Sequence, residues 1–396
     1  MNFQIDKNRL LETLQRVGRA TASYRKASGL NAWYLREFFF KAELDCLTVA
    51  ATDTYVFMEE TVSIGHTDGI NKTFAVEATP LLKAIKSLDN QSLEFEVLEY
   101  QVIVRHSVGS FALPLSESVE IYKATPRPDI KFNTAHQIEM EAPGLLSLLN
   151  RCAYAVAQDE LRPVMNGVCI SLTKEYTDFA ASDGHKLVRI RKKSITIDTP
   201  ATLVIPRKVT EILRKILPAT GFVELCFNEY VVDWPEDSKE PRPAAACRII
   251  VDDNTVITFR PIEGRYPNYN SVIPTKFYKG FTIGRVAFVK SLERLSQFTS
   301  SSGLITFTIE SGTIRMEAED KDFSVSATEV LPCSYYGEKF RIGFKDSSLI
   351  QTLKNINSLE VEFQAVDASR ATTFSPATQP DSEEVTMLLM PMIIGD

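Results

Sequence analysis

The sequence predicts an α+β protein built from three similar domains, and the first observation behind this prediction is a threefold internal repeat. A strand-like segment followed by a leucine-rich, helix-like segment begins at Phe3, at Gln137 and at Phe281. The starts lie 134 and 144 residues apart, a spacing that suits whole domains rather than the short units of a solenoid. The second observation is the length of 396 residues, which accommodates three domains of ordinary size.

Each repeat continues with further matching segments. They are a β-rich run that ends in an acidic turn (47–53, 178–183 and 315–320) and a second strand-helix pair (74–85, 203–213 and 340–353). A pair of strands follows, as at Leu93–Val97 and Gln101–Arg105 in the first repeat. We therefore expect each domain to be a β-α-β-β half-domain used twice.

Six helices are expected, at 9–19, 79–88, 143–157, 207–217, 285–297 and 346–356. Their apolar residues recur every three or four positions, as do Leu10, Leu14 and Val17, so each helix has one face for a sheet and one for solvent. Strands outnumber helices, and the connections are too short for repeated βαβ crossovers. This pattern favours antiparallel sheets with helices on one side.

Proline-containing linkers at 124–129 and 267–276 mark the expected boundaries between domains. We place the first domain at residues 1–128, the second at 129–275 and the third at 276–396.

The composition is that of a globular protein, with 44% hydrophobic and 24% charged residues. No apolar run approaches the roughly 18 residues that cross a bilayer, and the segment from Met1 to Arg9 is largely polar with no apolar signal core, so we expect a cytoplasmic protein. The six cysteines form no CxxC pair and are expected to be reduced. The four histidines show no metal-ligand spacing. We expect no metal and no cofactor.

Charge is distributed unevenly along the chain. The net charge is −7, which alone argues against a nucleic-acid partner, yet the six expected helices hold 14 basic and only four acidic residues. Arg16 and Arg19, for example, are spaced to share one helix face. Lys and Arg commonly cover solvated helix faces, so this pattern is open to a simple structural explanation. The alternative is a surface that holds the phosphates of a polyanion without sequence preference and with marked salt dependence.

Five short motifs point to a known family. They are Arg162–Gly167 (RPVMNG), Ala181–Leu187 (ASDGHKL), Val204–Lys208 (VIPRK), Glu263–Tyr269 (EGRYPNY) and Leu389–Met392 (LMPM). In this order, on a threefold repeat, the sequence resembles the bacterial DNA polymerase III beta subunits, the sliding clamps. The resemblance implies the DNA-clamp fold and a head-to-tail homodimeric ring of six domains, with helices lining a central hole and antiparallel sheets outside.

The resemblance further implies a DNA polymerase processivity factor rather than an enzyme, with no catalytic residues. The expected partners are encircled duplex DNA, the DNA polymerase III catalytic subunit, the clamp loader, other proteins that carry clamp-binding motifs, and a second copy of the chain. A divergent clamp paralogue with altered partner specificity is the alternative.

By the same resemblance, partner peptides would bind in a groove near the C-terminus that is lined by Met165, Ser182, Gly184, His185, Lys186, Leu187, Pro206, Leu388, Met390, Pro391 and Met392, with Tyr266 nearby. Methionine and leucine side chains suit an extended peptide with Leu or Phe anchors. The tail from Leu388 is also compatible with a last strand packed in the core, and both can hold if one edge of that strand is exposed. The family usually has Arg at the positions of Lys186 and Ile393, so contacts to a ligand's backbone or carboxylate should be weaker here.

Candidate DNA contacts are chosen by their charge on the expected helix faces. Arg25 is chosen because it lies in a loop similar to a DNA-facing loop of the family. They are Arg16, Arg19, Arg25, Lys26, Lys83, Lys86, Arg151, Arg207, Arg214, Lys215, Lys290, Arg294 and Lys354.

An enzymatic interpretation has little support in the sequence. Asp183 and His185 lie close enough in sequence to form an acid/base pair. No Ser or Cys nucleophile motif accompanies them, and a single histidine in a turn is more often structural. An unrelated triplicated enzyme would need a cluster of titratable groups that the sequence does not display.

Overall fold

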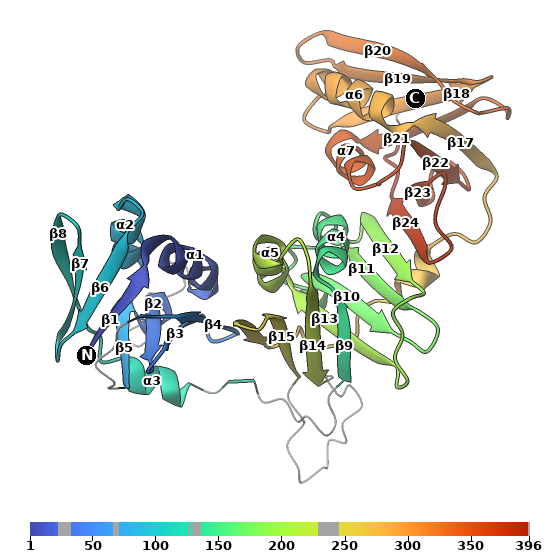
Figure 1. Cartoon of the computed structure of the whole chain (residues 1–396). Helices are drawn as coiled ribbons and strands as arrows, with labels where there is room; N and C mark the ends of the chain where they lie inside the picture. Colours follow the sequence, from blue (N-terminus) through green and yellow to red (C-terminus); the bar gives the residue numbers. More distant parts are fainter. Residues whose placement is uncertain (23–32, 66–70, 126, 129–135, 229–244, 395–396) are drawn as a thin grey trace. The chain divides into compact units, whose positions relative to one another are not determined.

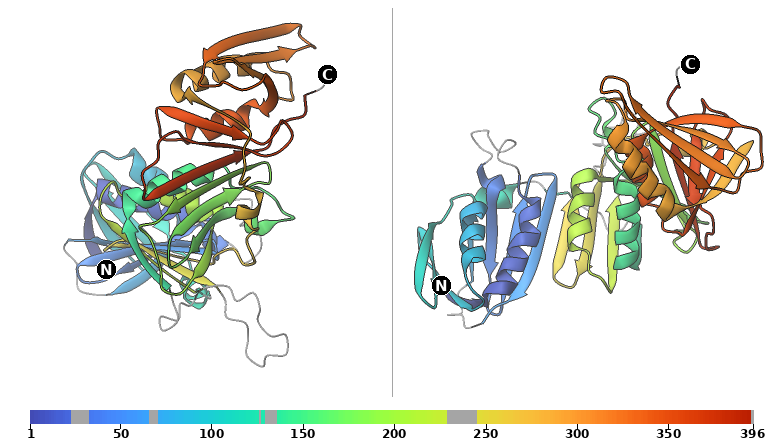
Figure 2. Two further views of the ribbon diagram at one scale, coloured as in Figure 1. Left: turned by 90° about the vertical axis from the view of Figure 1, so that its right-hand side faces the viewer. Right: turned by 90° about the horizontal axis from the view of Figure 1, so that it is seen from above.

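The computed structural model describes residues 1–22, 33–65, 71–125, 127–128, 136–228 and 245–394. These residues form two compact units (Figures 1 and 2). Unit 1 comprises Met1–Leu146 and Glu211–Pro261, and unit 2 comprises Ser147–Thr210 and Ile262–Asp396. Each unit therefore combines one terminal repeat with part of the central repeat.

The same order of elements occurs three times along the chain. The first repeat contains β1 (Asn2–Asp6), α1 (Lys7–Val17), β2 (Glu37–Ala42), β3 (Cys46–Thr52), β4 (Val56–Ser63), β5 (Lys72–Glu77), α2 (Ala78–Ser87), β6 (Ser92–Val97), β7 (Gln101–His106) and β8 (Gly109–Pro114). The second contains β9 (His136–Glu141), α4 (Ala142–Ala153), β10 (Gly167–Leu172), β11 (Thr177–Ser182), β12 (Lys186–Lys192), β13 (Ala201–Pro206), α5 (Arg207–Ile216), β14 (Phe222–Asn228), β15 (Ala246–Asp252) and β16 (Thr255–Phe259). The third contains β17 (Lys279–Gly284), α6 (Arg285–Leu295), β18 (Leu304–Glu310), β19 (Thr313–Asp320), β20 (Val325–Pro332), β21 (Phe340–Lys345), α7 (Asp346–Lys354), β22 (Glu360–Ala365), β23 (Thr372–Pro376) and β24 (Glu383–Leu389).

Each half-domain is thus β-α-β-β-β, and the predicted β-α-β-β unit was one strand short. A short helix, α3 (Val119–Ala124), follows β8. Short 3-10 helices precede β2 (Trp33–Arg36) and β10 (Pro163–Met165), and another follows β16 (Tyr269–Val272).

The six predicted helices are present, with ends within a few residues of the expected ones. In α1, the Asp6 carboxylate caps the first turn by accepting a hydrogen bond from the Arg9 backbone N–H at 3.0 Å. Leu10, Leu14 and Val17 are fully buried, as the spacing predicts. In unit 1, α1 packs beside α2, and in unit 2 α6 packs beside α7 (Figure 1).

The strands form four antiparallel sheets, which confirms the predicted α+β class. Unit 1 holds a four-stranded sheet, β1-β6-β7-β8, and an eight-stranded sheet, β5-β2-β3-β4-β16-β15-β14-β9. Unit 2 holds an eight-stranded sheet, β13-β10-β11-β12-β24-β23-β22-β17, and a four-stranded sheet, β20-β19-β18-β21. The first strand of each repeat pairs with strands of the second half, as β1 does with β6, so the two halves interlock.

The eight-stranded sheets join neighbouring repeats. In unit 1, β4 of the first repeat pairs with β16 of the second, with Met58 opposite Ile257. In unit 2, β12 of the second repeat pairs with β24 of the third, with Val188 opposite Met387. The four-stranded sheets end at β8 and at β20, and among the described strands neither has a neighbour on its outer edge.

Gly167, the first residue of β10, gives a test of this packing. A Cβ atom there would lie 2.9 Å from Val204 Cγ1 and would also overlap the carbonyl oxygen of Ile205 in the paired strand β13. We expect Gly167→Ala to lower the free energy of unfolding by about 2–3 kcal/mol, because the paired backbone must move. Urea denaturation of the purified protein measures this.

The matched control is Gly284→Ala, since a Cβ at Gly284 would meet no atom within 4 Å. A similar loss of stability in both variants would show that the close approach at Gly167 is not the cause.

Candidate functional site

A cavity of about 250 Å³ lies in unit 2, where the β11–β12 turn meets the end of β24. We call it the groove. Its lining comes from the 3-10 segment before β10, the turn itself, the segment after β16 and the last strand. The lining residues are Arg162, Met165, Ser182, Gly184, Lys186, Leu187, Tyr266, Pro267, Asn268, Tyr269, Val272, Ala371, Leu388 and Met390.

The β11–β12 turn is held by its own polar groups. Asp183 Oδ1 accepts hydrogen bonds from the backbone N–H groups of His185 and Lys186, each at 2.9 Å. Gly184 has φ +92°, a conformation that favours glycine. The Met390 backbone N–H donates to the His185 carbonyl oxygen at 2.9 Å, which ties the turn to the end of the last strand.

The Asp183 carboxylate is fully engaged in this turn rather than presented to a substrate. Burial opposes its ionisation, but hydrogen bonds from the Lys186 side chain and from the backbone N–H groups of Lys186 and His185 outweigh burial, so the pKa of Asp183 lies below its ordinary value. Lys186, whose side chain is 13% exposed, is paired with Asp183. The groove therefore contains an internally neutralised ion pair.

Apolar side chains make the floor of the groove. Met165, Leu187 and Leu388 are almost completely buried, whereas Met390 is 39% exposed at the rim. The Tyr266 hydroxyl accepts a hydrogen bond from the Ser182 backbone N–H at 3.1 Å, so the segment after β16 is fastened to the turn. A narrow apolar slot with a flexible methionine at its edge can accept a bulky hydrophobic side chain.

Eight of the twelve residues predicted for a peptide groove line this cavity: Met165, Ser182, Gly184, Lys186, Leu187, Tyr266, Leu388 and Met390. The other four lie close by without lining it. His185 is exposed in the turn, Pro206 ends β13 opposite Gly167, and Pro391 follows Met390. Met392 donates its backbone N–H to the Gly343 carbonyl oxygen at 2.8 Å.

Six lining residues were missed by the sequence reasoning. Arg162, Pro267, Asn268 and Tyr269 belong to the RPVMNG and EGRYPNY motifs, so those motifs could have supplied them. Val272 and Ala371 carry no sequence signal, because their place in the groove depends on how the chain returns after β16 and before β23.

The candidate DNA contacts fall into two groups. Arg19, Lys83, Lys86, Lys215 and Lys290 are exposed, and no ion pair within the described residues involves them. Others are bound to carboxylates: Arg16 to Glu60 and Asp252, Arg151 to Glu383, Arg294 to Glu329 and Lys354 to Glu293. Arg207 and Arg214 also have interactions within the chain. Arg25 and Lys26 lie outside the described residues.

Arg16 belongs to a partly buried network. Its Nε lies 3.2 Å from Glu60 Oε2, and its Nη2 lies 3.2 Å from Asp252 Oδ2. Glu60 also accepts a hydrogen bond from the Thr13 hydroxyl at 2.8 Å. Burial raises the pKa of Glu60, against the opposing effects of Arg16 and Thr13. The Arg16 side chain thus supports the joint between β4 and β15–β16.

No group of three or more His, Cys, Asp or Glu side chains in the described part of the chain could hold a metal ion. All six cysteines are free thiols. None of the described helices is both long and apolar enough to cross a membrane.

Comparison of Arg16 with Arg19 separates structural from surface cations. Arg16→Met leaves Glu60 buried with only the Thr13 hydroxyl as partner, so we expect the free energy of unfolding to fall by about 2–3 kcal/mol at pH 7. Arg19→Met, which removes an exposed cation, should change it by less than about 0.5 kcal/mol. Chemical denaturation at several pH values measures both.

The pH dependence checks the cause. Without Arg16 the pKa of Glu60 rises further in the folded protein, so the native state takes up a proton more readily than the unfolded state as the pH falls. The deficit of Arg16→Met should therefore shrink between pH 7 and pH 5. A deficit independent of pH would mean that lost side-chain packing, not the unpaired carboxylate, destabilises the variant.

Comparisons with known proteins cover nearly the whole chain. The N-terminal, central and C-terminal domain models of the DNA polymerase III beta subunit match residues 1–126, 139–268 and 270–392. The beta sliding clamp of Treponema pallidum is 25% identical over 348 residues, which cover 86% of this chain and 88% of that protein. The crystal structure of the Bacillus subtilis DNA polymerase sliding clamp is similar with a TM-score of 0.85, 20% identity and full coverage of both chains. The Pseudomonas aeruginosa sliding clamp bound to griselimycin is similar with a TM-score of 0.86, 20% identity and full coverage of both chains.

Proposed function

Because the chain belongs to the DNA polymerase III beta subunit family, it is a DNA polymerase processivity factor, and we propose that it works as a head-to-tail homodimeric ring around duplex DNA. This proposal rests on the strand joint, by which we mean the pairing of a strand of one repeat with the last strand of the next repeat. The chain contains this joint twice. The pairs β4–β16 and β12–β24 are built in the same way, and their third equivalent would be β20 paired with β8.

A second copy of the chain can supply that third pair. The outer edges of β8 and β20 have no neighbouring strand among the described residues, and a free sheet edge is a template for pairing with another chain. Because β8 and β20 are different surfaces, the contact is heterologous, and two copies close a ring only when each supplies both edges. This arrangement would give six pseudo-equivalent domains with six equivalent joints.

The two joints within the chain also predict the register of the third. Met58 faces Ile257 in one joint and Val188 faces Met387 in the other. The strand pairings within each repeat make Ala327 equivalent to Met58 and Val188, and Phe111 equivalent to Ile257 and Met387. Ala327 should therefore face Phe111. The same register sets Val330, which is 56% exposed, opposite Val108, which is 89% exposed, and the contact would cover both.

The exposed cations Arg19, Lys83, Lys86, Lys215 and Lys290 are our leading DNA contacts. They lie on or next to the helices and present charge without any base-reading motif. Such contacts hold phosphates weakly and without sequence preference, as sliding requires. The protein would act by topology and would make or break no covalent bond. Its free cysteines suit the reducing bacterial cytosol, where replication takes place.

The groove would receive partner peptides from the polymerase catalytic subunit, the clamp loader and other clamp-binding proteins. Its buried leucines and its methionines support recognition of apolar anchors on an extended segment. The ion pair of Lys186 with Asp183 supports the prediction that a ligand carboxylate gains little from this lysine. The comparisons give no support to the alternative of a divergent paralogue.

A cysteine pair tests the ring and its register together. In the predicted register Ala112 faces Ser326, so the double variant Ala112→Cys, Ser326→Cys should form disulfides between two chains under mild oxidation. The product should have the mass of two chains and carry two disulfides per dimer. Non-reducing electrophoresis and mass spectrometry measure it.

The control is the pair Ala112→Cys, Ala327→Cys, in which the second cysteine is shifted by one residue and points to the opposite face of β20. Equal cross-linking of both pairs would contradict the register. When the ring is loaded on nicked circular DNA first and cross-linked afterwards, it should resist 1 M salt and be released when the DNA is linearised. Salt-sensitive loss from the intact circle would contradict topological binding, because only charge contacts are screened.

A substitution at the rim tests the peptide groove. Met390→Ala should weaken binding of a fluorescent peptide with adjacent Leu and Phe anchors by roughly tenfold, since a methionine side chain that a bound peptide covers contributes on the order of 1–2 kcal/mol. Ile393→Ala is the control, because Ile393 is 93% exposed and does not line the groove. Fluorescence anisotropy gives both affinities, and an equal effect of the two substitutions would contradict this location of the site.

A further inference from the structure

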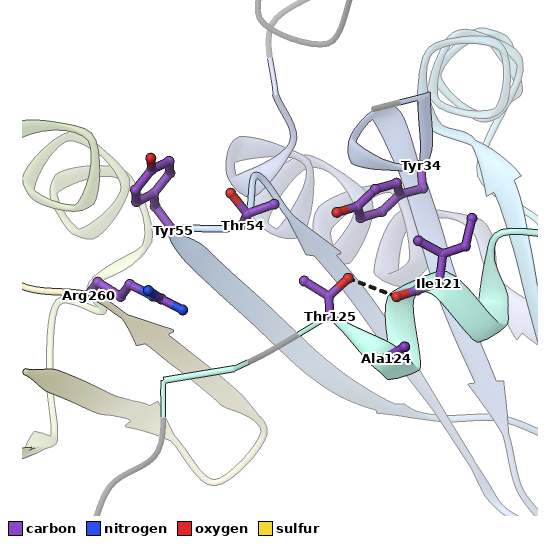
Figure 3. Close-up of a pocket in the computed structure, with 7 residues that line it drawn as sticks. All are labelled: Tyr34, Thr54, Tyr55, Ile121, Ala124, Thr125 and Arg260. Atoms are coloured by element: carbon purple, nitrogen blue, oxygen red, sulfur yellow. Dashed lines mark hydrogen bonds between the residues drawn. The ribbon is translucent and has the colours of Figure 1, made fainter. Parts of the chain in front are cut away.

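We propose that a second cavity, in unit 1, binds short extended peptides that carry a bulky apolar or aromatic anchor next to an acidic side chain. This junction cavity has a volume of about 550 Å³ and is lined by Tyr34, Thr54, Tyr55, Ile121, Ala124, Thr125 and Arg260. In Figure 3, Tyr55 and Arg260 lie on one side of the cavity, and Tyr34, Ile121 and Thr125 lie on the other. The cavity occupies the place in the β4–β16 joint that the groove occupies in the β12–β24 joint.

Two backbone hydrogen bonds at the junction cavity have equivalents at the groove. The Arg260 N–H donates to the Tyr55 carbonyl oxygen at 3.1 Å, as the Met390 N–H does to His185 at 2.9 Å. Behind the junction cavity, the Ser116 N–H donates to the Ala75 carbonyl oxygen at 2.9 Å. Behind the groove, the Ile262 N–H makes the same bond to Val204 at 3.0 Å.

The two turns that border these sites are also built alike. Asp53 Oδ1 accepts the backbone N–H groups of Tyr55 and Val56, at 3.0 and 2.9 Å, as Asp183 does for His185 and Lys186. Thr54 has φ +78°, where the other turn has a glycine. A threonine in this conformation is strained, and the Thr52 hydroxyl supports it by accepting the Thr54 N–H at 2.9 Å.

Matching aromatic supports lie beneath the two cavities. Tyr122 packs with Phe39, Ala50 and Ala75 under the junction cavity. Tyr266 packs with the equivalent residues Cys169, Ala180 and Val204 under the groove. The junction cavity thus has the same framework as the groove, supported by its own cluster of buried residues.

The side chains that face the ligand differ, and they indicate a different preference. Arg260 stands at the position of Met390, and it is exposed. Among the described residues that line the cavity it is the only charged one, and no ion pair within the described part of the chain involves it. Arg127 nearby has its charge satisfied, at 2.8 Å from Glu59 and 2.8 Å from the Tyr122 hydroxyl. An acidic group is therefore the complement of this cavity.

The remaining lining supplies an apolar contact for an anchor. Tyr55 is 67% exposed and Ile121 is 40% exposed, and tyrosine rings offer large contact areas at low entropic cost. The hydroxyl of Thr125 is already used, donating to the Ile121 carbonyl oxygen at 2.8 Å (Figure 3). The choice of a peptide as the ligand rests on the proposed function of the groove, whereas the acidic preference rests on Arg260.

The test uses the full chain and a defined photo-reactive probe. The probe is an amidated peptide in which benzoylphenylalanine lies between two aspartates, and the matched probe carries asparagines instead. After irradiation, mass spectrometry should map adducts to segments that contain Tyr55 or Ile121. Arg260→Gln should reduce these adducts roughly tenfold, Arg260→Lys should reduce them less, and the asparagine probe should be as weak as Arg260→Gln. Met390→Ala should leave them unchanged.

The outcomes separate this inference from the proposed function. Adducts at the groove alone, or junction adducts that ignore Arg260→Gln, would overturn the second site and leave the groove intact. Adducts at the junction alone would support the second site while contradicting peptide binding in the groove. Displacement of the probe by a single-stranded oligothymidine at equal concentration would assign the cavity to nucleic acid and overturn a peptide site.

Discussion

Antiparallel pairing between the fourth strand of one half-domain and the last strand of the next repeat is the constraint on which the structure depends. It extends a four-stranded sheet into an eight-stranded one in each unit. It also brings the turn before β4 or β12 against the residue that follows β16 or β24. Both cavities form where this turn meets the end of the incoming strand, because the sheet stops there. The binding surfaces are therefore consequences of how the repeats are joined.

The helices could be predicted from sequence because their determinants are local. Asp6 caps α1 and the stripe of Leu10, Leu14 and Val17 buries one face, and both signals lie within the segment itself. The predicted half-domain was one strand short, because strands such as β4 carry polar residues whose partners lie far away in sequence. Glu59 and Glu60 interrupt the apolar pattern of β4, yet Glu60 is paired with Arg16 in the fold. Arg189 in β12 is likewise bonded to Asn270 and Glu384.

The same limit applies to the candidate sites. Eight of the twelve residues predicted from the family resemblance line the groove. Short motifs can identify them because the motifs contain the turn and the strand end that form the groove. Counting charge on helices could not distinguish Arg19, which is exposed, from Arg16, whose partner Asp252 comes from another repeat. Partner carboxylates 200 or more residues away, such as Glu383 for Arg151, become visible only when the sheets are assembled. The number of basic residues on the helices is therefore larger than the number of cations that are available to DNA.

The proposed register also explains why the joint between two chains should be the one that opens. Arg260 and Met390 each donate a backbone hydrogen bond to the turn opposite, at Tyr55 and at His185. In the register that sets Phe111 opposite Ala327, the equivalent residue of β8 is Pro114, which faces Ser324. Proline has no backbone N–H to donate, so this joint lacks the bond that fastens the strand end in the other two. The turn before β20 is also longer than the turns before β4 and β12. A ring that must admit DNA would thus have its weakest strand joint between subunits, where separation leaves both chains folded.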